Sequence, residues 1–178
     1  MNEEQYISEL ERLWPVPPKA LTHGWKSVTM ADWDAMEGPA GRALDVADQA
    51  VQACPFSPEL WCMRGELIQL AEKHPLEESL RSFMRAIEID PAFARAHQLV
   101  GEYYDAAKDQ PETALPWYER AIVLGGDVDA YVGRARAIAQ TRTVSEALAS
   151  LQPEACPCFD DPDIQEISRE IAEGIWSP

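Results

Sequence analysis

Residues 61–91 read WCMRGELIQLAEKHPLEESLRSFMRAIEIDP, and the order of small, aromatic and proline residues in this stretch decides the fold. Gly65 lies within one predicted helix, Phe83 and Ala86 lie within a second, and Pro91 ends that second helix. The same spacing of small and large apolar residues returns twice further along the chain. Equivalent residues are 36, 35, 35, 34 and 33 positions apart, for the pairs Gly65 and Gly101, Phe83 and Tyr118, Ala86 and Ala121, Gly101 and Ala135, and Ala114 and Ala147.

The repeat has a simple physical basis. A small residue in the first helix of each pair, such as Gly65, lets the second helix approach closely, and a large apolar residue such as Phe83 fills the gap. A helix pair cannot bury its own apolar face, so neighbouring pairs must stack. Residues 43–55 carry only the second half of the pattern, and residues 29–37 are predicted to supply the first helix of this degenerate unit, whose matching positions are Ala43, Ala47, Ala50 and Pro55.

This pattern resembles the tetratricopeptide repeat (TPR) family, whose 34-residue motif is W-x2-L-G-x2-Y…A-x3-F…P. The resemblance covers about residues 40–151. It implies an all-α fold, a right-handed superhelix (α-α solenoid) of about three to four helix pairs with extra N- and C-terminal helices. The chain departs from the motif at a few positions: Arg64 and Arg134 replace leucine, His97 replaces tryptophan, and Gly125-Gly126 replaces the terminal proline.

The predicted organisation has three parts. Residues 1–28 form an amphipathic helix, over 3–14, and a proline-rich linker. Residues 156–178 form a capping helix that covers the open end of the stack, with one apolar face made of Ile164, Ile167, Ile171 and Ile175. The repeat region between them spans 29–155 and divides into the degenerate unit 29–56 and the repeats 57–92, 93–126 and 127–153.

The charge of the chain excludes some classes of partner. It has 15 lysine and arginine residues against 31 acids, a net charge of −16, whereas a nucleic-acid binder needs cations to displace phosphate counterions. Nucleic acid and anionic membranes are therefore not expected as partners. With no signal-like segment and no apolar stretch of about 18 residues, we expect a cytoplasmic protein, a monomer or a dimer.

No motif for catalysis is present. The chain has no phosphate-binding glycine loop, no G-x-S-x-G and no H-E-x-x-H, so it is predicted not to be an enzyme and to need no cofactor. Its four cysteines are predicted to be free thiols. Cys156-Pro157-Cys158 offers two thiolates to a metal but lacks the further ligands of a structural zinc site, so no metal is predicted.

The family resemblance implies an inner groove lined by the first helix of each pair, holding an extended or helical peptide. The alternative is that these positions are only exposed polar helix residues. A chaperone-type carboxylate clamp is disfavoured, because Asn2 is the single asparagine and the lining is mostly acidic or neutral. The predicted partner-binding residues are Glu59, Cys62, Glu66, Gln69, Arg95, Gln98, Glu102, Asp105, Asp129, Val132 and Arg136.

Three functions follow as hypotheses. The first is a protein-protein interaction module, which is a small scaffold, an adaptor or a chaperone-like protein. It binds a protein or peptide, and in one version of this hypothesis that partner is basic. The second is an acidic inhibitor, of the immunity type, that occludes a basic effector. The third is structural self-association through the N-terminal helix. Occupancy of the groove by residues 15–28 themselves also stays open.

Overall fold

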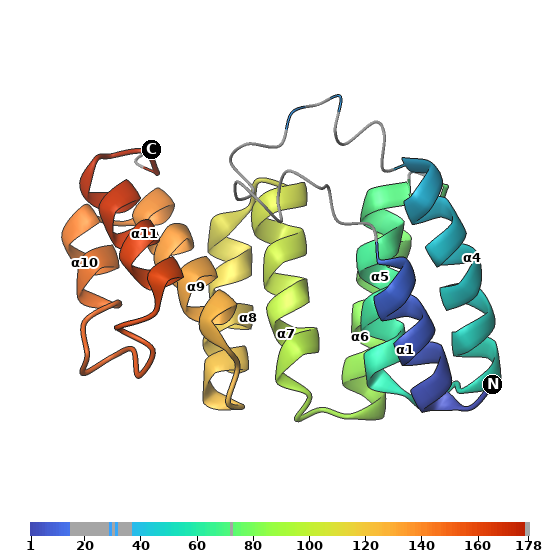
Figure 1. Ribbon diagram of the computed structural model, residues 1–178. Coiled ribbons are helices and arrows are strands. Elements are labelled where there is room, and N and C mark those ends of the chain that lie inside the picture. Colours follow the sequence, from blue (N-terminus) through green and yellow to red (C-terminus); the bar gives the residue numbers. More distant parts are fainter. Residues whose placement is uncertain (15–28, 30, 32–36, 72, 177–178) are drawn as a thin grey trace. The chain divides into compact units, whose positions relative to one another are not determined.

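The computed structural model describes residues 1–14, 29, 31, 37–71 and 73–176, and these residues form helices joined by turns, without a strand (Figure 1). The chain divides into two compact units, unit 1 from Met1 to Pro91 and unit 2 from Ala92 to Pro178. Among the described residues no helix is long and apolar enough to cross a membrane. The predicted helix over 29–37 and the linker over 15–28 lie almost wholly outside the described residues.

Unit 1 contains α1 (Glu3–Leu13), α4 (Glu37–Ala53), α5 (Pro58–Ala71) and α6 (Glu77–Ile89). Successive helices pack against each other, and α1 packs on both α4 and α5. The predicted N-terminal helix is confirmed, and Asn2 begins it with a capping box in which its side chain accepts from the Gln5 backbone. The core of this unit includes Leu10, Leu44, Leu60, Leu67 and Ile68.

Two prolines lie within helices of the structure. Pro39 follows Gly38 in the first turn of α4, a position where a helix tolerates proline. Pro116 lies inside a helix of unit 2 instead of at a helix end. Helix boundaries in this chain therefore follow the packing pattern more closely than the proline positions.

Unit 2 begins with α7 (Ala94–Glu102), which continues directly into a π-helical turn, η2 (Tyr103–Ala107). It then contains α8 (Pro111–Val123), α9 (Val128–Thr141), the short α10 (Val144–Ala149) and α11 (Pro162–Ala172). Helix α8 packs on α7 and α9, while α10 and α11 pack on α9 and on each other.

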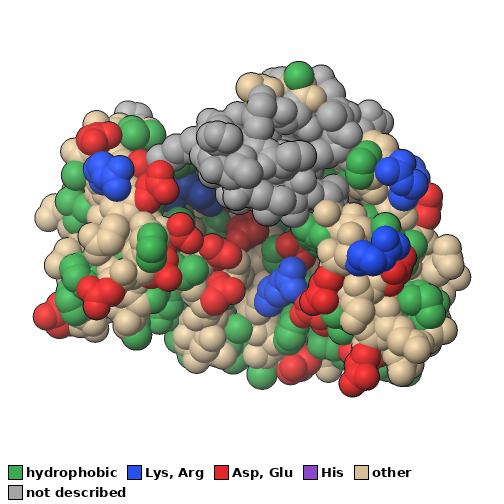
Figure 2. Space-filling model, in the orientation of Figure 1, with side chains coloured by type: hydrophobic (Ala, Val, Ile, Leu, Met, Phe, Trp, Pro, Cys, Tyr) green, Lys and Arg blue, Asp and Glu red, His purple; other side chains and the backbone are tan. Residues whose placement is uncertain are grey.

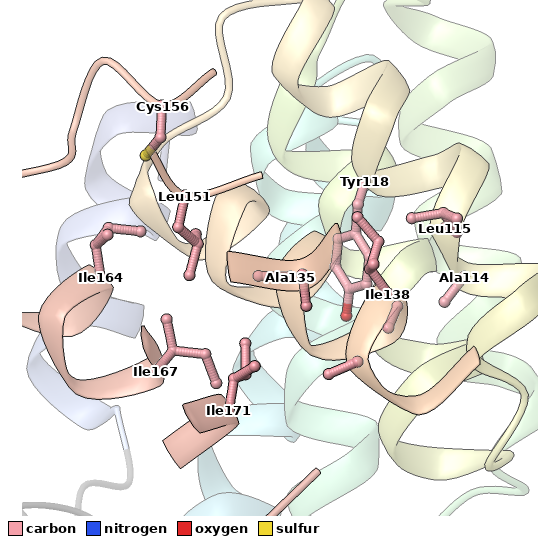
Figure 3. Packing of buried hydrophobic residues seen from close by; sticks show 13 residues of the cluster. Ala114, Leu115, Tyr118, Ala135, Ile138, Leu151, Cys156, Ile164, Ile167 and Ile171 are labelled. Carbon is pink, nitrogen blue, oxygen red and sulfur yellow. The ribbon is translucent and has the colours of Figure 1, made fainter. Parts of the chain in front are cut away.

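The apolar side of α11 lies against α9 and α10, as the predicted capping helix requires within unit 2 (Figure 3). Ile164, Ile167 and Ile171 are at most 4% exposed, and burying each such side chain contributes about 1.5–3 kcal/mol. Ile175 was predicted to continue this face but is 58% exposed. The helix ends at Ala172 and the chain reverses at Gly174, whose φ is +76°, so Ile175 leaves the face.

The small residues of the repeat do allow close approach of helices. A Cβ at Gly65 would lie 2.7 Å from Phe83 Cδ1, and one at Gly101 would lie 2.8 Å from Tyr118 Cε1. The Tyr118 ring is also approached from α9, where a Cβ at Gly133 would lie 2.9 Å from its Cδ1. The sequence pattern pointed to Gly65 and Gly101 but missed Gly133, which lies shortly before the small residue of the third repeat.

The two arginines that replace leucine in the repeat link their own helix to neighbouring helices. Arg64 Nε donates to Asp48 at 2.7 Å and its Nη1 donates to Ser82 Oγ at 2.7 Å, so α5 is held to α4 and α6. Arg134 Nη2 donates to the Ser150 carbonyl at 2.6 Å, at the end of α10. Each arginine thus exchanges an apolar contact for hydrogen bonds to the following helix or its end.

Candidate functional site

The predicted partner-binding residues lie in both units, four in unit 1 and seven in unit 2. Helix α5 carries the four of unit 1, of which Cys62 is fully buried and offers no surface to a partner. Glu59 and Glu66 are partly exposed, while Gln69 is exposed and its amide donates to Ser79 Oγ at 2.9 Å. This part of the prediction therefore provides three polar side chains on one helix.

In unit 2 the structure brings five of the predicted residues together, on α7, η2 and α9. We name this group the α7–α9 cluster. It lies beside Val132, which packs against the core, and Arg95, which stands at the start of α7. The members of the cluster are Gln98, Glu102, Asp105, Asp129 and Arg136.

The buried half of the cluster is an ion pair. Arg136 Nη2 lies 2.7 Å from Asp105 Oδ2, and Arg136 Nε donates to the same oxygen at 2.8 Å. The Asp105 side chain is 2% exposed and that of Arg136 is 23% exposed. Gln140 donates to the other Asp105 oxygen at 3.2 Å and the Tyr118 hydroxyl donates to Oδ2 at 3.4 Å, so both carboxylate oxygens are satisfied.

The buried aspartate lies in the π-helical turn η2. A π turn takes five residues where an α turn takes fewer, so it shifts the side chains that follow α7 around the helix axis. Tyr103 and Asp105 of this turn are both buried, and Asp105 reaches Arg136 on α9. The turn closes when the Gln110 N–H donates to the Tyr104 carbonyl at 2.8 Å.

The other half of the cluster is acidic and only partly exposed. The buried Gln98 amide donates to Glu102 Oε1 at 2.9 Å and also hydrogen-bonds the Asp129 carboxylate. Burial, and then repulsion from Asp129, raise the pKa of Glu102. Partial loss of water and repulsion from Asp127 likewise raise the pKa of Asp129. Two carboxyl groups thus share one neutral donor, while the nearby Arg136 is already paired with Asp105.

This arrangement suits a cation. Carboxylates with spare lone pairs accept hydrogen bonds from an ammonium or a guanidinium group, and an incoming positive charge would also relieve their mutual repulsion. A hollow of about 340 Å³ adjoins the cluster, between the start of α7 and the turn into α9; its lining includes Arg95, Gln98 and Asp127. In Figure 2, several acidic side chains lie close together in the part of the view where Figure 1 shows α9 and α11.

Known structures share this architecture. TTC0263, a thermophilic TPR protein of Thermus thermophilus, superposes with a TM-score of 0.61 over 98% of this chain and 99% of its own, at 15% identity. YrrB, a TPR protein with an unusual peptide-binding site, superposes with a TM-score of 0.52 over 97% and 93% of the two chains, at 16% identity. The chain has the tetratricopeptide-repeat fold.

Comparison of sequences gives shorter matches. No family model matches the chain. Cell division cycle protein 27 homolog B of Arabidopsis thaliana is 34% identical over 59 residues, which is 33% of this chain and 8% of that protein. Anaphase-promoting complex subunit 3 of Schizosaccharomyces pombe is 30% identical over 77 residues, 43% of this chain and 11% of its own length. The matched segment is thus only a small part of these curated relatives.

In the TPR fold of this chain, the candidate residues lie on α5, α7, η2 and α9, which begin the three helix pairs. Sequence reasoning selected them by their place beside the packing positions, but it missed Gln140 and Tyr118 as partners of Asp105. Trp176, outside the repeats, also contacts a member of the cluster. Its Nε1 donates to Glu170 at 2.9 Å, and its ring lies 5.5 Å from the Arg136 guanidinium.

The pH dependence of the free energy of unfolding tests whether the cluster disfavours the charged form of Glu102. The pKa of Glu102 is higher in the folded chain than its ordinary 4.5, so its charged form opposes folding near neutral pH, and this cost is relieved as pH falls through the folded pKa. We expect Glu102→Gln to raise the free energy of unfolding near neutral pH, with the gain shrinking as the pH falls toward 4.5. Urea unfolding of both proteins across this range checks it. A variant that is less stable by the same amount at every pH would contradict the raised pKa.

Proposed function

We propose that the chain is a protein-protein interaction module that binds a basic side chain of a peptide or helix at the α7–α9 cluster of unit 2. The observation that carries the proposal is the pair of carboxyl groups, Glu102 and Asp129, that share the single amide of Gln98 while Arg136 is held by Asp105. A lysine or arginine of the partner would supply the missing positive charge.

Two further findings support a peptide partner. The hollow beside the cluster is open to solvent on the surface of α7 and the α8–α9 turn, and its lining includes Gln98, so an extended segment seated there would lie next to the amide that the two carboxyl groups share. A structural neighbour, YrrB, is a TPR protein with a peptide-binding site. The net charge of −16 adds long-range attraction for a basic partner at low salt.

The experiment compares two pools of random peptides of one length, one with lysine or arginine fixed at a central position and one with glutamine there. We expect the immobilised wild-type chain to retain the basic pool selectively. The double variant Glu102→Gln/Asp129→Asn should lose most of that selectivity, about tenfold or more, because charged hydrogen bonds contribute about 1.5–3 kcal/mol each. Equal retention of both pools by the wild type would overturn the proposal.

A charge-matched control separates a local site from general attraction. Glu112 and Glu119 are exposed on α8, so Glu112→Gln/Glu119→Gln changes the net charge by the same amount away from the cluster. The proposed site predicts that this control binds the basic pool as the wild type does. Equal loss in both double variants, with binding abolished by moderate salt, would favour the second candidate function, an acidic inhibitor that covers a basic protein.

Self-association through the N-terminal helix has less support as a function. The apolar side of α1 is used within unit 1, where Leu10 is fully buried and Tyr6, Ile7 and Leu13 pack against the core of α4 and α5. The exposed side of this helix is polar and includes Glu4, Ser8 and Arg12. A concentration-dependent dimer in sedimentation measurements would restore this alternative.

A further inference from the structure

Two cysteines of unit 2 lie close enough to react with each other. Cys156 and Cys158 are in the turn between α10 and α11, and their Sγ atoms are 3.1 Å apart. A disulfide bond measures about 2.05 Å, so the two sulfur atoms must close a gap of about 1 Å. Both are free thiols in the structure, as are Cys54 and Cys62 of unit 1.

The two thiols differ in access. Cys156 is fully buried and packs with Leu151 and Ile164 in the core of unit 2, where Figure 3 shows its sulfur near Leu151. Cys158 is partly exposed at the surface side of the same turn. An oxidant from solvent would therefore react with Cys158 first, and Cys156 would then react with the modified Cys158.

The backbone holds the pair in this position. The Cys156 N–H donates to the Gln152 carbonyl at 2.9 Å, and the Asp161 N–H donates to the Cys158 carbonyl at 2.9 Å. On the Cys156 side, Arg134 of α9 donates to the Ala155 carbonyl at 3.3 Å. The turn is thus fixed on both sides of the dithiol, and neither thiol is drawn into a group that could hold a metal, since the described residues contain no cluster of three or more such ligands.

We propose that Cys156 and Cys158 form a reversible redox modification site, a dithiol that a low-molecular-weight disulfide such as oxidised glutathione converts to an intramolecular disulfide. The Cys158 thiolate attacks a sulfur of glutathione disulfide, the S–S bond of that molecule breaks, and the first glutathione leaves as a thiolate that takes up a proton. The Cys156 thiolate then attacks Cys158 Sγ and displaces the second glutathione. Two protein thiols are oxidised and one glutathione disulfide is reduced to two glutathione molecules.

The surroundings make this reaction slow near neutral pH. Burial, and then the hydrogen bond with Cys156, raise the pKa of Cys158 to about 11, with Asp161 of the same turn acting in the same direction. Tyr131 and Arg134 of α9 also face the pair, and burial, followed by the two cysteines, raises the pKa of Tyr131. Only the thiolate attacks a disulfide. The reaction rate of an unperturbed thiol stops rising with pH above its pKa of about 8.5, whereas the rate for the folded chain should continue to rise about tenfold per pH unit beyond that pH.

The test uses the full chain, incubated with oxidised glutathione, quenched in acid and digested with trypsin. Cleavage after Arg142 and Arg169 isolates a peptide, residues 143–169, that contains both cysteines of the dithiol and neither Cys54 nor Cys62. We expect the wild-type peptide to lose the mass of two hydrogen atoms without gaining glutathione, and to recover its mass with reduced glutathione. The isolated peptide, treated in the same way, serves as the unfolded reference for the pH dependence.

Two variants separate the roles of the thiols. Cys156→Ala should keep a stable glutathione adduct on Cys158, because no second thiol can displace it, whereas Cys158→Ala should form no adduct in the same time because Cys156 is buried. Circular dichroism of each variant confirms that it is folded. A wild-type chain that accumulates a lasting glutathione adduct in this peptide, or a Cys158→Ala variant that reacts as fast as Cys156→Ala, would overturn the proposal.

Discussion

Replacing Asp105 by alanine is expected to lower the free energy of unfolding of the chain by about 3 kcal/mol, because it leaves the Arg136 charge and the Tyr118 hydroxyl without their partner. Asp105 accepts from Arg136 at 2.8 Å, from Gln140 at 3.2 Å and from Tyr118 at 3.4 Å. This loss of stability lies at the low end of the range for breaking a buried ion pair, because the Arg136 side chain is 23% exposed and can be partly hydrated after the substitution. Urea unfolding followed by circular dichroism measures it.

Hydrogen exchange resolves where that stability is lost. The amide protons of α7, α8 and α9 should lose protection, because each of these helices contributes a partner to the network or leads directly into one. Removing both charges, with Asp105→Ala/Arg136→Ala, should cost less than the sum of the two single changes, because no uncompensated charge is then left buried. As a control, Glu9→Ala removes an ion pair with Arg12, whose side chain is 66% exposed, and should change stability little. A loss for Asp105→Ala as small as that control would show that the buried pair is not stabilising.

The repeat spacing predicts much of this fold because close helix packing requires particular residue sizes. Gly65 lies against Phe83 and Gly101 lies against Tyr118, as the spacing of 36 and 35 residues indicates from the sequence alone. The same rule does not identify Gly133, since the Tyr118 ring is approached from two helices and a repeat pattern describes one approach per pair.

The sequence pattern does not predict the π-helical turn. Periodicity predicts a continuous helix through Tyr103 and Tyr104, and nothing in that stretch indicates five residues in one turn. Asp105 lies in this turn and is buried against Arg136, so these two residues bind each other, whereas the sequence analysis expected both of them to contact a partner. Within the described part of unit 2, Asp105 forms an ion pair with an arginine, whereas the carboxyl groups of Glu102 and Asp129 share the Gln98 amide and form no such ion pair.

The departures from the repeat pattern are informative in physical terms. A leucine in place of Arg64 would fill space but would leave Asp48 and Ser82 without this donor, and the side chain of Arg64 is only 12% exposed. Sequence alone shows that Arg64 and Arg134 break the motif. It does not show which acceptors, distant along the chain, the folded protein brings to them.

Gly65→Ala is expected to lower the free energy of unfolding by about 1–3 kcal/mol, although alanine is the better helix former by about 1 kcal/mol. The added Cβ would lie 2.7 Å from Phe83 Cδ1 and 2.9 Å from its Cζ, well inside the roughly 3.5–4.0 Å of a favourable carbon contact. Phe83 is fully buried, so its ring cannot turn away into solvent, and α5 and α6 must move apart.

Two further variants test whether this crowding is the cause. Gly38→Ala places a methyl group on the exposed start of α4, where Arg42 Nη1, at 3.8 Å, is the nearest side-chain atom of the described residues, so we expect stability to be unchanged or slightly raised. In Gly65→Ala/Phe83→Leu the smaller side chain makes room for the methyl group, and the double variant should lose less than the two single changes added together. Additive losses would instead mean that Gly65 is needed for a reason other than the approach of Phe83, and the close-packing account of the repeat would fail at the position where it is most direct.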